Sequence, residues 1–238
     1  IEDYILVEQN TKLIIEKNIK MKILDCSNDS TIEMMINEDA DVEYQILNSK
    51  NSKRFIQCKG KINITQISLE PTVEELNLIL QSPNADAKVE LLSLGNAFSQ
   101  VFKQSIWHNQ KNTISNISNF GVAINKASIL FDTTGKIDKG MAKSKCSQLS
   151  KGIVMDDTSS ITSKPILLID EYDVIANHGA SIGKMSDESL FYLMSRGLTK
   201  QEAFLLILEG IIGPFVQKIF DEGLKNSINQ KLEQWIKR

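Results

Sequence analysis

The stretch PILLIDEYDVIANHGASIGKMSDESLFYLMSRGLTKQEAFLLILEGIIG, residues 165–213, joins two different sequence patterns. Its first part contains a short apolar run typical of a β-strand, which leads into Asn177-His178-Gly179-Ala180. Its second part carries the start and stop signals of two short helices. His178, one of the chain's two histidines, lies where the patterns meet, and we expect a turn there between the last strand and the first helix.

From Ser186 onwards the pattern is helical. Ser186 is a favourable N-cap residue, and the two acidic residues after it suit the positive end of a helix dipole. Gly197 can adopt the left-handed conformation that ends a helix, and Thr199 with Glu202 has the spacing of a capping box. We expect Pro214 to break this second helix and to begin a third. A final helix would carry an apolar stripe formed by Leu224, Ile228, Leu232 and Trp235.

Before this helical part, from Ile1 to Gly183, the pattern is that of short strands separated by polar turns. Alternating or apolar runs of three to six residues are bounded by Asn, Asp, Ser and Gly, as turn chemistry requires. The runs lie at residues 42–46, 62–64, 76–78, 89–92, 122–124, 129–131, 153–155 and 166–169. Because strands do not alternate with helices, a doubly wound sheet is disfavoured, but a sandwich, a barrel and a β-helix all remain open. We therefore expect a mainly β body over residues 1–185 and a helical domain over residues 186–238.

The composition is that of an ordinary globular protein. Of the 238 residues, 42% are hydrophobic and 24% are charged, and the net charge of -3 disfavours nucleic-acid binding. No apolar run approaches the roughly 20 residues that a membrane span needs, and no signal peptide is visible in a chain that starts at Ile1. Cys26, Cys58 and Cys146 are widely spaced, which fits neither a disulfide framework nor a zinc site and indicates a reducing, cytoplasmic setting.

Few residues suggest chemistry. Residues 179–185, GASIGKM, look like a phosphate loop, but the glycine spacing is one residue short and Met185 replaces the Ser or Thr that would hold Mg²⁺. The acidic pairs at residues 156–157 and 170–171 fit solvated carboxylates in turns. Motifs of serine hydrolases, zinc proteases and dinucleotide-binding enzymes are missing from the sequence. We therefore expect a protein that is not an enzyme, such as an assembly subunit.

The two histidines and Cys146 each allow two interpretations. His178 could be a metal ligand or a proton carrier, or it could be a hydrogen-bonded histidine in a tight turn. The residues alone favour the second, structural interpretation. His108 could be a second ligand that converges on His178, but a surface or turn histidine beside a packed Trp107 is the preferred interpretation. Cys146 has the most polar sequence neighbours of the three cysteines, so it is the candidate for an exposed thiol.

The opening stretch resembles the SufB/SufD family of the SUF system for iron–sulfur cluster assembly. The resemblance follows the pattern P-x-L-x-I-x-x-x-D-V-x-x-x-H-G-A-x-x-G and then D-E-x-L-F-Y-L-x-S-R-G-L-x-x-x-E-A. The matching residues are Pro165, Leu167, Ile169, Asp173, Val174, His178, Gly179, Ala180 and Gly183, then Asp187, Glu188, Leu190, Phe191, Tyr192, Leu193, Ser195, Arg196, Gly197, Leu198, Glu202 and Ala203. Upstream, His108, Thr113 and Ser115 resemble the family's H-x(4)-T-x-S segment, and residues 131–137 are similar to its F-x-G-x-I strand with extra residues.

This resemblance implies a right-handed parallel β-helix with a C-terminal α-helical domain. It also implies a scaffold role: SufB and SufD pair through their β-helices, and each holds a SufC ATPase subunit with its C-terminal helices. The cluster is built at the SufB–SufD interface. Residues implied to lie in the SufC-docking region are Phe191, Tyr192, Arg196, Gly197 and Glu202.

The resemblance is SufD-like rather than SufB-like. SufB-like members carry a functional cysteine at the position of Ile169, whereas His178 aligns with a SufD histidine at the subunit interface. His178 then becomes a candidate cluster-site residue, since imidazole is a suitable ligand for iron. It would complete a site whose cysteines come from the SufB-like partner. The nascent cluster would be transient and shared, with none bound stably by this chain alone.

Two other functions stay open. The chain could be a homodimeric SufB/SufD-type scaffold that acts with SufC alone, with Cys146 or another thiol receiving sulfur. It could also be a β-helix carbohydrate-active enzyme, although such enzymes need clustered carboxylates that the sequence does not show. A homodimer of the isolated chain could mimic the heterodimer. Flavin binding is left open, and the expected location is the cytoplasm, or the plastid stroma in a eukaryote.

Overall fold

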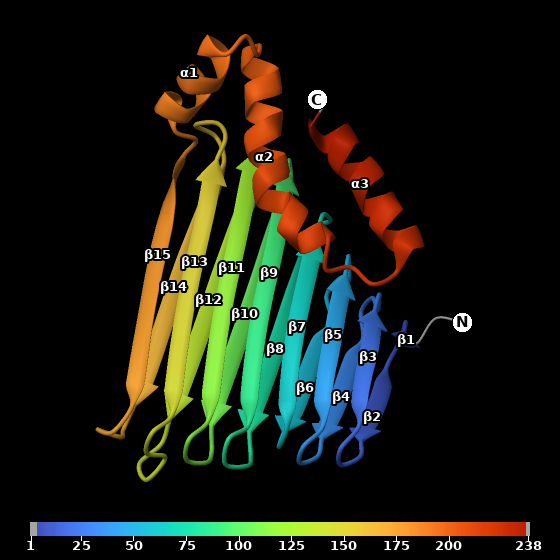
Figure 1. Ribbon diagram of the computed structural model, residues 1–238, viewed down its shortest axis with the longest axis vertical. Coiled ribbons are helices and arrows are strands. Elements are labelled where there is room, and N and C mark those ends of the chain that lie inside the picture. Colours follow the sequence, from blue (N-terminus) through green and yellow to red (C-terminus); the bar gives the residue numbers. More distant parts are fainter. Residues whose placement is uncertain (1–3, 237–238) are drawn as a thin grey trace.

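A computed structural model describes residues 4–236 of the chain, with side chains as far as Lys231. Within these residues, fifteen strands form two sheets, and every pair of neighbouring strands runs parallel (Figure 1). Consecutive strands alternate between the two sheets, so each successive pair of strands forms one coil of a parallel β-helix. The predicted mainly β, parallel β-helix fold with C-terminal helices is confirmed.

The odd-numbered strands form sheet A and the even-numbered strands form sheet B. Sheet A consists of β1 (Ile5–Val7), β3 (Lys20–Asp25), β5 (Asp41–Leu47), β7 (Lys61–Ser68), β9 (Asp86–Asn96), β11 (Ile114–Ile124), β13 (Lys145–Val154) and β15 (Ile175–Lys184). Sheet B consists of β2 (Thr11–Ile15), β4 (Thr31–Ile36), β6 (Lys53–Cys58), β8 (Thr72–Leu80), β10 (Ser99–His108), β12 (Ser128–Ile137) and β14 (Ser160–Ile169).

The coils lengthen along the chain. Ile5 pairs with Ile23 in the first coils, whereas Ile114 pairs with the more distant Lys145 in the later ones. Strands β9 to β15 have 10 or 11 residues each, so the predicted length of three to six residues is wrong for them. The reason is that many of their inward positions hold Ser, Thr, Asn or Gln, which interrupts the apolar alternation that marks a strand in the sequence.

Asparagine side chains shape many of the turns between strands. Positive φ occurs at Asn18, Asp29, Asp39, Asn48, Asn51, Asn84, Ala97, Asn112, Asn125, Lys126 and Lys143 among the described non-glycine residues. Asparagine enters this region more readily than most residues because its short side chain can bond nearby backbone. Asn48 Oδ1 accepts from the N–H of Leu69 at 3.1 Å, and Asn51 Oδ1 accepts from the N–H of Val73 at 3.1 Å. The turns therefore also tie each coil to the next.

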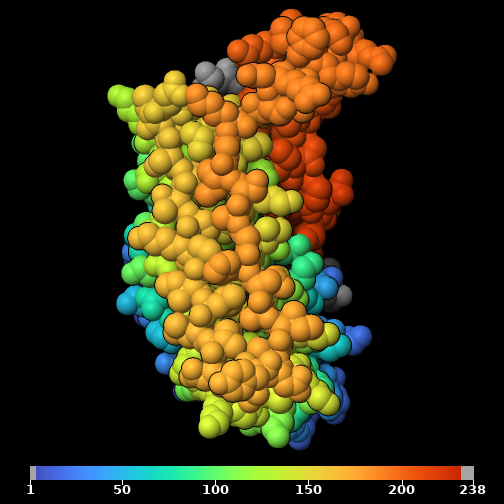
Figure 2. All heavy atoms as spheres, turned by 90° about the vertical axis from the view of Figure 1, so that its left-hand side faces the viewer, coloured from blue at the N-terminus to red at the C-terminus, as the bar shows by residue number. Residues whose placement is uncertain are grey.

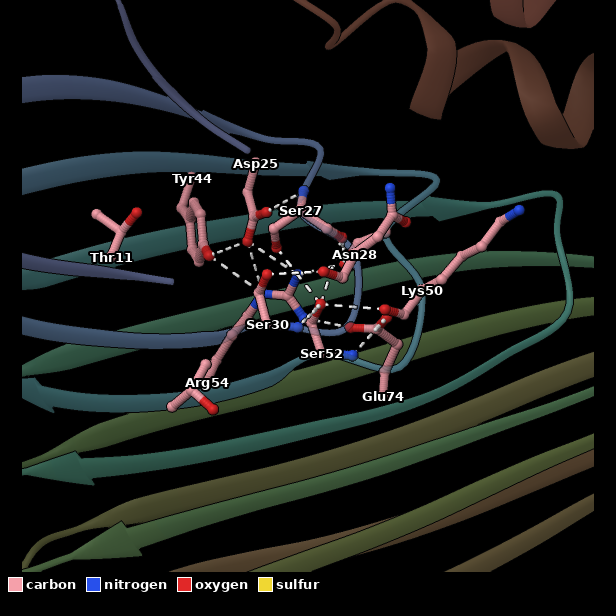
Figure 3. A network of polar contacts seen from close by, with 12 residues as sticks. Thr11, Asp25, Ser27, Asn28, Ser30, Tyr44, Lys50, Ser52, Arg54 and Glu74 are labelled. Atoms are coloured by element: carbon pink, nitrogen blue, oxygen red, sulfur yellow. Dashed lines mark hydrogen bonds and ion pairs between the residues drawn. The ribbon is translucent and has the colours of Figure 1, made fainter. Parts of the chain in front are cut away.

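An ion network is enclosed among the apolar residues of the first coils (Figure 3). Arg54 donates through Nε to Asp25 at 2.8 Å, through Nη2 to Ser49 at 2.8 Å, and through Nη1 to Glu74. The hydroxyl of Tyr44 also donates to Asp25. These side chains come from strands β3, β5, β6 and β8 and the turn between β5 and β6, so the network links successive coils.

Burial makes this network sensitive to the loss of one member. Arg54, Asp25, Glu74 and Tyr44 are each at most 3% exposed. Burial opposes the charge of Arg54, but Tyr44, Asp25 and Glu74 outweigh that effect and hold its pKa above the usual value. A buried charge that loses its partner is far more costly than an apolar residue of similar volume at the same place. The network therefore favours one register of the coils over others.

We expect Arg54→Met to destabilise the protein by about 3–5 kcal/mol, because two buried carboxylates lose their countercharge. Replacing Asp25 by Leu and Glu74 by Met in the same chain should recover much of that loss. Urea unfolding followed by circular dichroism measures both variants. Equal loss in the single and triple variants would contradict this account of the network.

Three helices follow the β-helix: α1 (Asp187–Ser195), α2 (Lys200–Val216) and α3 (Glu222–Ile236). Ser186 caps α1 by accepting from the N–H of Ser189 at 3.2 Å, and the capping box at the start of α2 is present, as predicted. The predicted break at Pro214 is wrong, because α2 continues through Pro214 to Val216. Proline so close to a helix end removes a single intrahelical hydrogen bond, which the packing of α2 offsets.

Helix α3 begins at Glu222, and Ile228 is buried and Leu224 partly buried, in line with the predicted apolar stripe. The side chains of Leu232 and Trp235, also assigned to this stripe, lie outside the described part of the chain. In residues 4–236 no helix has both the length and the apolar character that crossing a membrane requires.

Helices α2 and α3 cover part of the outer face of sheet A (Figure 1). Leu208, Ile212 and Val216 of α2 pack into one cluster with leucine and isoleucine side chains of the sheet. The corner between α2 and α3 is held by Gln45, whose Nε2 donates to the Lys218 carbonyl at 2.5 Å and whose Oε1 accepts from Phe220 N–H at 3.2 Å. Helix α1 packs against α2 beyond the end of the strands. Only residues 185–186 separate β15 from α1.

Candidate functional site

The last coil leaves one end of the β-helix open. Strands β14 and β15 are the edge strands of sheets B and A, and Figure 2 views this end of the molecule. An edge strand presents unpaired backbone N–H and C=O groups, which form a template for another strand. Pro165 lies within β14, and proline is tolerated in a sheet at such an edge.

His178 lies in the middle of β15 and its Cα pairs with that of Gln148. It continues an inward row that runs from Val89 through Ile117 to Gln148, all of them buried. His178 itself is exposed because it occupies the edge strand at the open end. The imidazole is thus on the face of the strand that elsewhere forms the interior, and it is accessible from outside the molecule.

The predicted turn at His178 is wrong. Strand β15 runs from Ile175 to Lys184 and includes both Gly179 and Gly183. Gly179 lies over Leu149 of the neighbouring strand, where an added Cβ would be 3.5 Å from Leu149 Cδ1. Glycines that suggested a turn in the sequence therefore belong to a flat edge strand, and the change to helix comes later, at residues 185–186.

Exposed apolar side chains surround the open end. They are Leu149, Ile166, Leu168, Tyr172, Ile175 and Ile182, each at least 36% exposed. Tyr172 is completely exposed on a loop that Glu171 organises by accepting from the N–H groups of Gly140, Tyr172 and Asp173. Ile169, which the sequence resemblance aligned with a cysteine of SufB-like members, points inward at the end of β14 and is half-buried. Apolar groups gathered at one exposed end are typical of an interaction surface.

His108 is buried within β10, so the prediction of a turn histidine is wrong. Its Nδ1 lies 2.7 Å from Thr113 Oγ1 and its Nε2 lies 2.8 Å from Ser115 Oγ. These contacts give the H-x(4)-T-x-S spacing a physical meaning, because each hydroxyl satisfies one ring nitrogen. Burial lowers the pKa of His108 to about 4, so the ring is neutral at neutral pH.

We expect the stability of the protein to fall as the pH is lowered from about 6.5 to about 4. In this window the unfolded chain protonates His108 while the folded protein does not, so the loss reaches about 3 kcal/mol. Urea unfolding at several pH values measures it. His108→Gln should lose this part of the pH dependence, whereas His178→Gln keeps the buried ring and should retain it. A pH profile unchanged by His108→Gln would contradict this assignment.

The three cysteines are free and poorly suited to outside attack. Cys146 is 2% exposed, so the prediction of an exposed thiol is wrong. Burial raises its pKa, and it raises the pKa of Cys26 to about 11 and that of Cys58 to about 12. Gly135 makes room for Cys146, because a Cβ at Gly135 would lie 2.4 Å from its Sγ. The sequence neighbours of Cys146 are polar, but its own side chain points into the β-helix.

Helix α1 presents a second exposed surface. Phe191 is 74% exposed and Tyr192 is 58% exposed, and both line a surface cavity of about 620 Å³. The guanidinium of Arg196 lies 5.3 Å from the centre of the Tyr192 ring. Gly197 has φ of 99°, which reverses the chain after α1, and Glu202 is engaged in the capping box of α2. Of the five predicted docking residues, Phe191 and Tyr192 offer apolar area and Arg196 contacts Tyr192. Gly197 and Glu202 instead shape the connection from α1 to α2.

The two histidines are not brought together, because His108 is enclosed in sheet B and His178 lies at the edge of sheet A. Among the residues that the structure describes, no group of three or more His, Cys, Asp or Glu side chains is arranged to hold a metal ion. Sequence reasoning missed the apolar residues around the open end and the polar residues inside it. Amides and hydroxyls that interrupt the apolar alternation of residues 100–150, such as Gln104, Asn119 and Gln148, were the signal for the second group.

Comparison with known proteins assigns the family. A family model described as SUF system FeS cluster assembly, SufBD core domain, matches residues 4–211, and the chain belongs to this family. It is similar to the iron-sulfur cluster assembly protein SufD of Bacillus subtilis, with 34% identity over 161 residues, 68% of this chain and 37% of that protein. This confirms the SufD-like resemblance.

Other relatives match shorter parts of the chain. The iron-sulfur cluster assembly protein SufD of Escherichia coli is 33% identical over 85 residues, 36% of this chain and 20% of that protein. An iron-sulfur cluster assembly SufBD family protein of Mycobacterium tuberculosis is 32% identical over 136 residues, 56% of this chain and 16% of that protein. The matches therefore span between 16% and 37% of the length of these three relatives.

Proposed function

We propose that this chain is a SufD-like scaffold subunit that takes part in iron–sulfur cluster assembly and is not itself an enzyme. The observation that carries the proposal is the open end of the β-helix, where His178 is exposed on an edge strand amid apolar side chains. Such an end suits a subunit interface, because a second β-strand would satisfy the exposed backbone and cover the apolar groups. Family membership and the SufD relatives support the same role.

At that interface His178 would supply one ligand to a nascent cluster. Neutral imidazole binds iron, and iron–sulfur clusters with histidine ligands are known, although cysteine thiolates are the usual ligands. The thiolates would come from a SufB-like partner, since Cys26, Cys58 and Cys146 have raised pKa values and Cys58 and Cys146 are buried. The cluster is cargo, held between two subunits and passed on.

The exposed face of α1 would bind the SufC ATPase. Phe191 and Tyr192 offer a large apolar area on a helix whose ends are well defined by Ser186 and Gly197. Aromatic side chains held in place by rigid structure contribute strongly to protein interfaces. The complex would work in the cytoplasm, or in the plastid stroma of a eukaryote.

The first test is co-expression of this chain with its SufB-like and SufC partners, as wild type and as His178→Ala. After anaerobic reconstitution, iron and acid-labile sulfide are measured per complex. We expect His178→Ala to assemble normally and to hold less than a third as much cluster. Ser181→Ala, on the same strand but on its opposite face, is the matched control and should behave as wild type.

Full cluster content in His178→Ala would overturn the role of His178. Failure of the wild type to form the complex would overturn the choice of partners. If the chain instead forms a stable dimer with itself and binds SufC alone, the homodimeric scaffold is the correct alternative. Turnover of a polysaccharide by the purified chain would overturn the scaffold role altogether.

The docking surface has a separate test. We expect the double variant Phe191→Ser and Tyr192→Ser to weaken SufC binding at least tenfold, because both apolar side chains would be lost from the contact. Isothermal titration calorimetry with purified SufC measures the affinity. Ile14→Ser, which removes an equally exposed apolar side chain from sheet B, is the control and should bind as wild type. Unchanged affinity in the double variant would place SufC elsewhere.

A further inference from the structure

The interior of the β-helix becomes polar towards its open end. In sheet B one inward row runs from Leu76 through Gln104 to Thr133. In sheet A a second inward row runs from Leu91 through Asn119 to Ser150. These residues are at most 5% exposed. Buried polar groups are unfavourable unless they are hydrogen-bonded. The polar residues of these two rows therefore need hydrogen-bond partners inside the β-helix.

Gln104 and Asn119 meet inside the β-helix but do not satisfy each other. Asn119 Nδ2 donates to Gln104 Oε1 at 2.9 Å. Gln104 Nε2 and Asn119 Oδ1 then have no hydrogen-bond partner among the described residues, although each residue is only 3% exposed. Exchanging the oxygen and nitrogen of both amides gives the same result, with one donor and one acceptor left over. A small molecule that both donates and accepts would satisfy the pair.

Small polar side chains lie between this pair and the open end. Thr133 and Ser150 occupy the next coil, and Thr133 Oγ1 donates to Gln148 Oε1 at 3.4 Å. In the last coil Pro165 continues the row of Thr133 and Ala180 continues the row of Ser150. Ser163, two residues before Pro165 on the same inward face, pairs with Phe131, and its Oγ is also buried and without a hydrogen-bond partner among the described residues. Neighbouring strands in a sheet are about 4.8 Å apart, so the amide pair lies about 10 Å below the open end.

We infer that the last coils of this β-helix hold a file of ordered water molecules that runs from Gln104 and Asn119 to the open end. Apart from Pro165 and Ala180 in the last coil, the lining consists of amides and hydroxyls, and none of these groups carries a formal charge, which suits water rather than a metal ion or an anion. Buried water typically makes two to four hydrogen bonds to groups of this kind. The file ends beside Gln148, the neighbour of His178 in its inward row.

The presence of the water does not depend on the proposed function. Its use at a subunit interface rests on the proposed function, because it requires the open end to be that interface. A partner that covers the open end separates His178 from bulk solvent. Water inside the β-helix would still reach the imidazole from below, through Gln148 and Thr133.

The test uses the isolated chain, so its failure is distinct from failure of the proposed function. Water–amide cross-relaxation in NMR, or electron density in a high-resolution crystal structure, should show ordered water at Gln104 and Asn119. The double variant Gln104→Met and Asn119→Leu should lose this signal without any rise in the midpoint of urea unfolding. Gln100→Met, on the same strand, is the control, because both amide atoms of Gln100 already have partners in Ser93, Ser68 and Glu70. It should retain the signal.

Two results would overturn the inference. One is the lack of any long-lived water signal in the wild type. The other is a higher unfolding midpoint in the double variant, which would show that two unsatisfied groups had been removed rather than hydrated ones. If the double variant does not fold, Ser163→Ala replaces it, because that hydroxyl lies in the last coil. Ser163→Ala should abolish the water signal at the open end of the β-helix. An unchanged water signal there would contradict the proposed file of water molecules.

Discussion

Parallel stacking of coils is the constraint on which the rest of this structure depends. Because each strand hydrogen-bonds to the equivalent strand of the next coil, side chains at equivalent positions form rows through the interior. The side chains of a row can be apolar, charged or amide groups, but each of them is shielded from solvent only where a neighbouring coil covers it. The ion network of Arg54 obeys this rule with partners from several coils. At the last coil the rule leaves His178 uncovered, and the candidate functional site lies at that position.

Much of this architecture could be predicted from the sequence. Turn residues between short apolar runs indicated a β body, and Ser186, Thr199 and Glu202 located the helix starts, because capping requires particular side chains at fixed spacing. The choice of a β-helix over a sandwich or barrel came from family resemblance alone. Pairing between coils is non-local, and the separation of paired residues along the chain grows from the first coils to the later ones, so no fixed repeat marks it in the sequence.

The candidate site could be predicted only in part. The role of His178 stays a prediction, and its strand was mistaken for a turn, because glycine in an edge strand and glycine in a turn look the same in a sequence. His108 was expected at the surface or in a turn beside Trp107, and Cys146 was expected near the surface from its polar neighbours, yet both side chains are buried. In a β-helix whose interior rows contain polar side chains, the polarity of a residue no longer predicts whether its side chain is buried or exposed. Only the hydrogen-bond partners of each side chain make that distinction.

The two-residue connection between β15 and α1 has a mechanical consequence. Strand β15 is bonded to a single neighbour, β13, and its last pair is Val154 with Lys184, immediately before the connection. The corner after α2 is anchored to sheet A by Gln45, so it acts as a pivot. A force that lifts α1 would load the Lys184 end of β15 first and open its hydrogen bonds one after another, towards His178. Sequential opening needs less force than simultaneous shear, so the strand that bears the imidazole can be peeled from β13 starting at the end that joins α1.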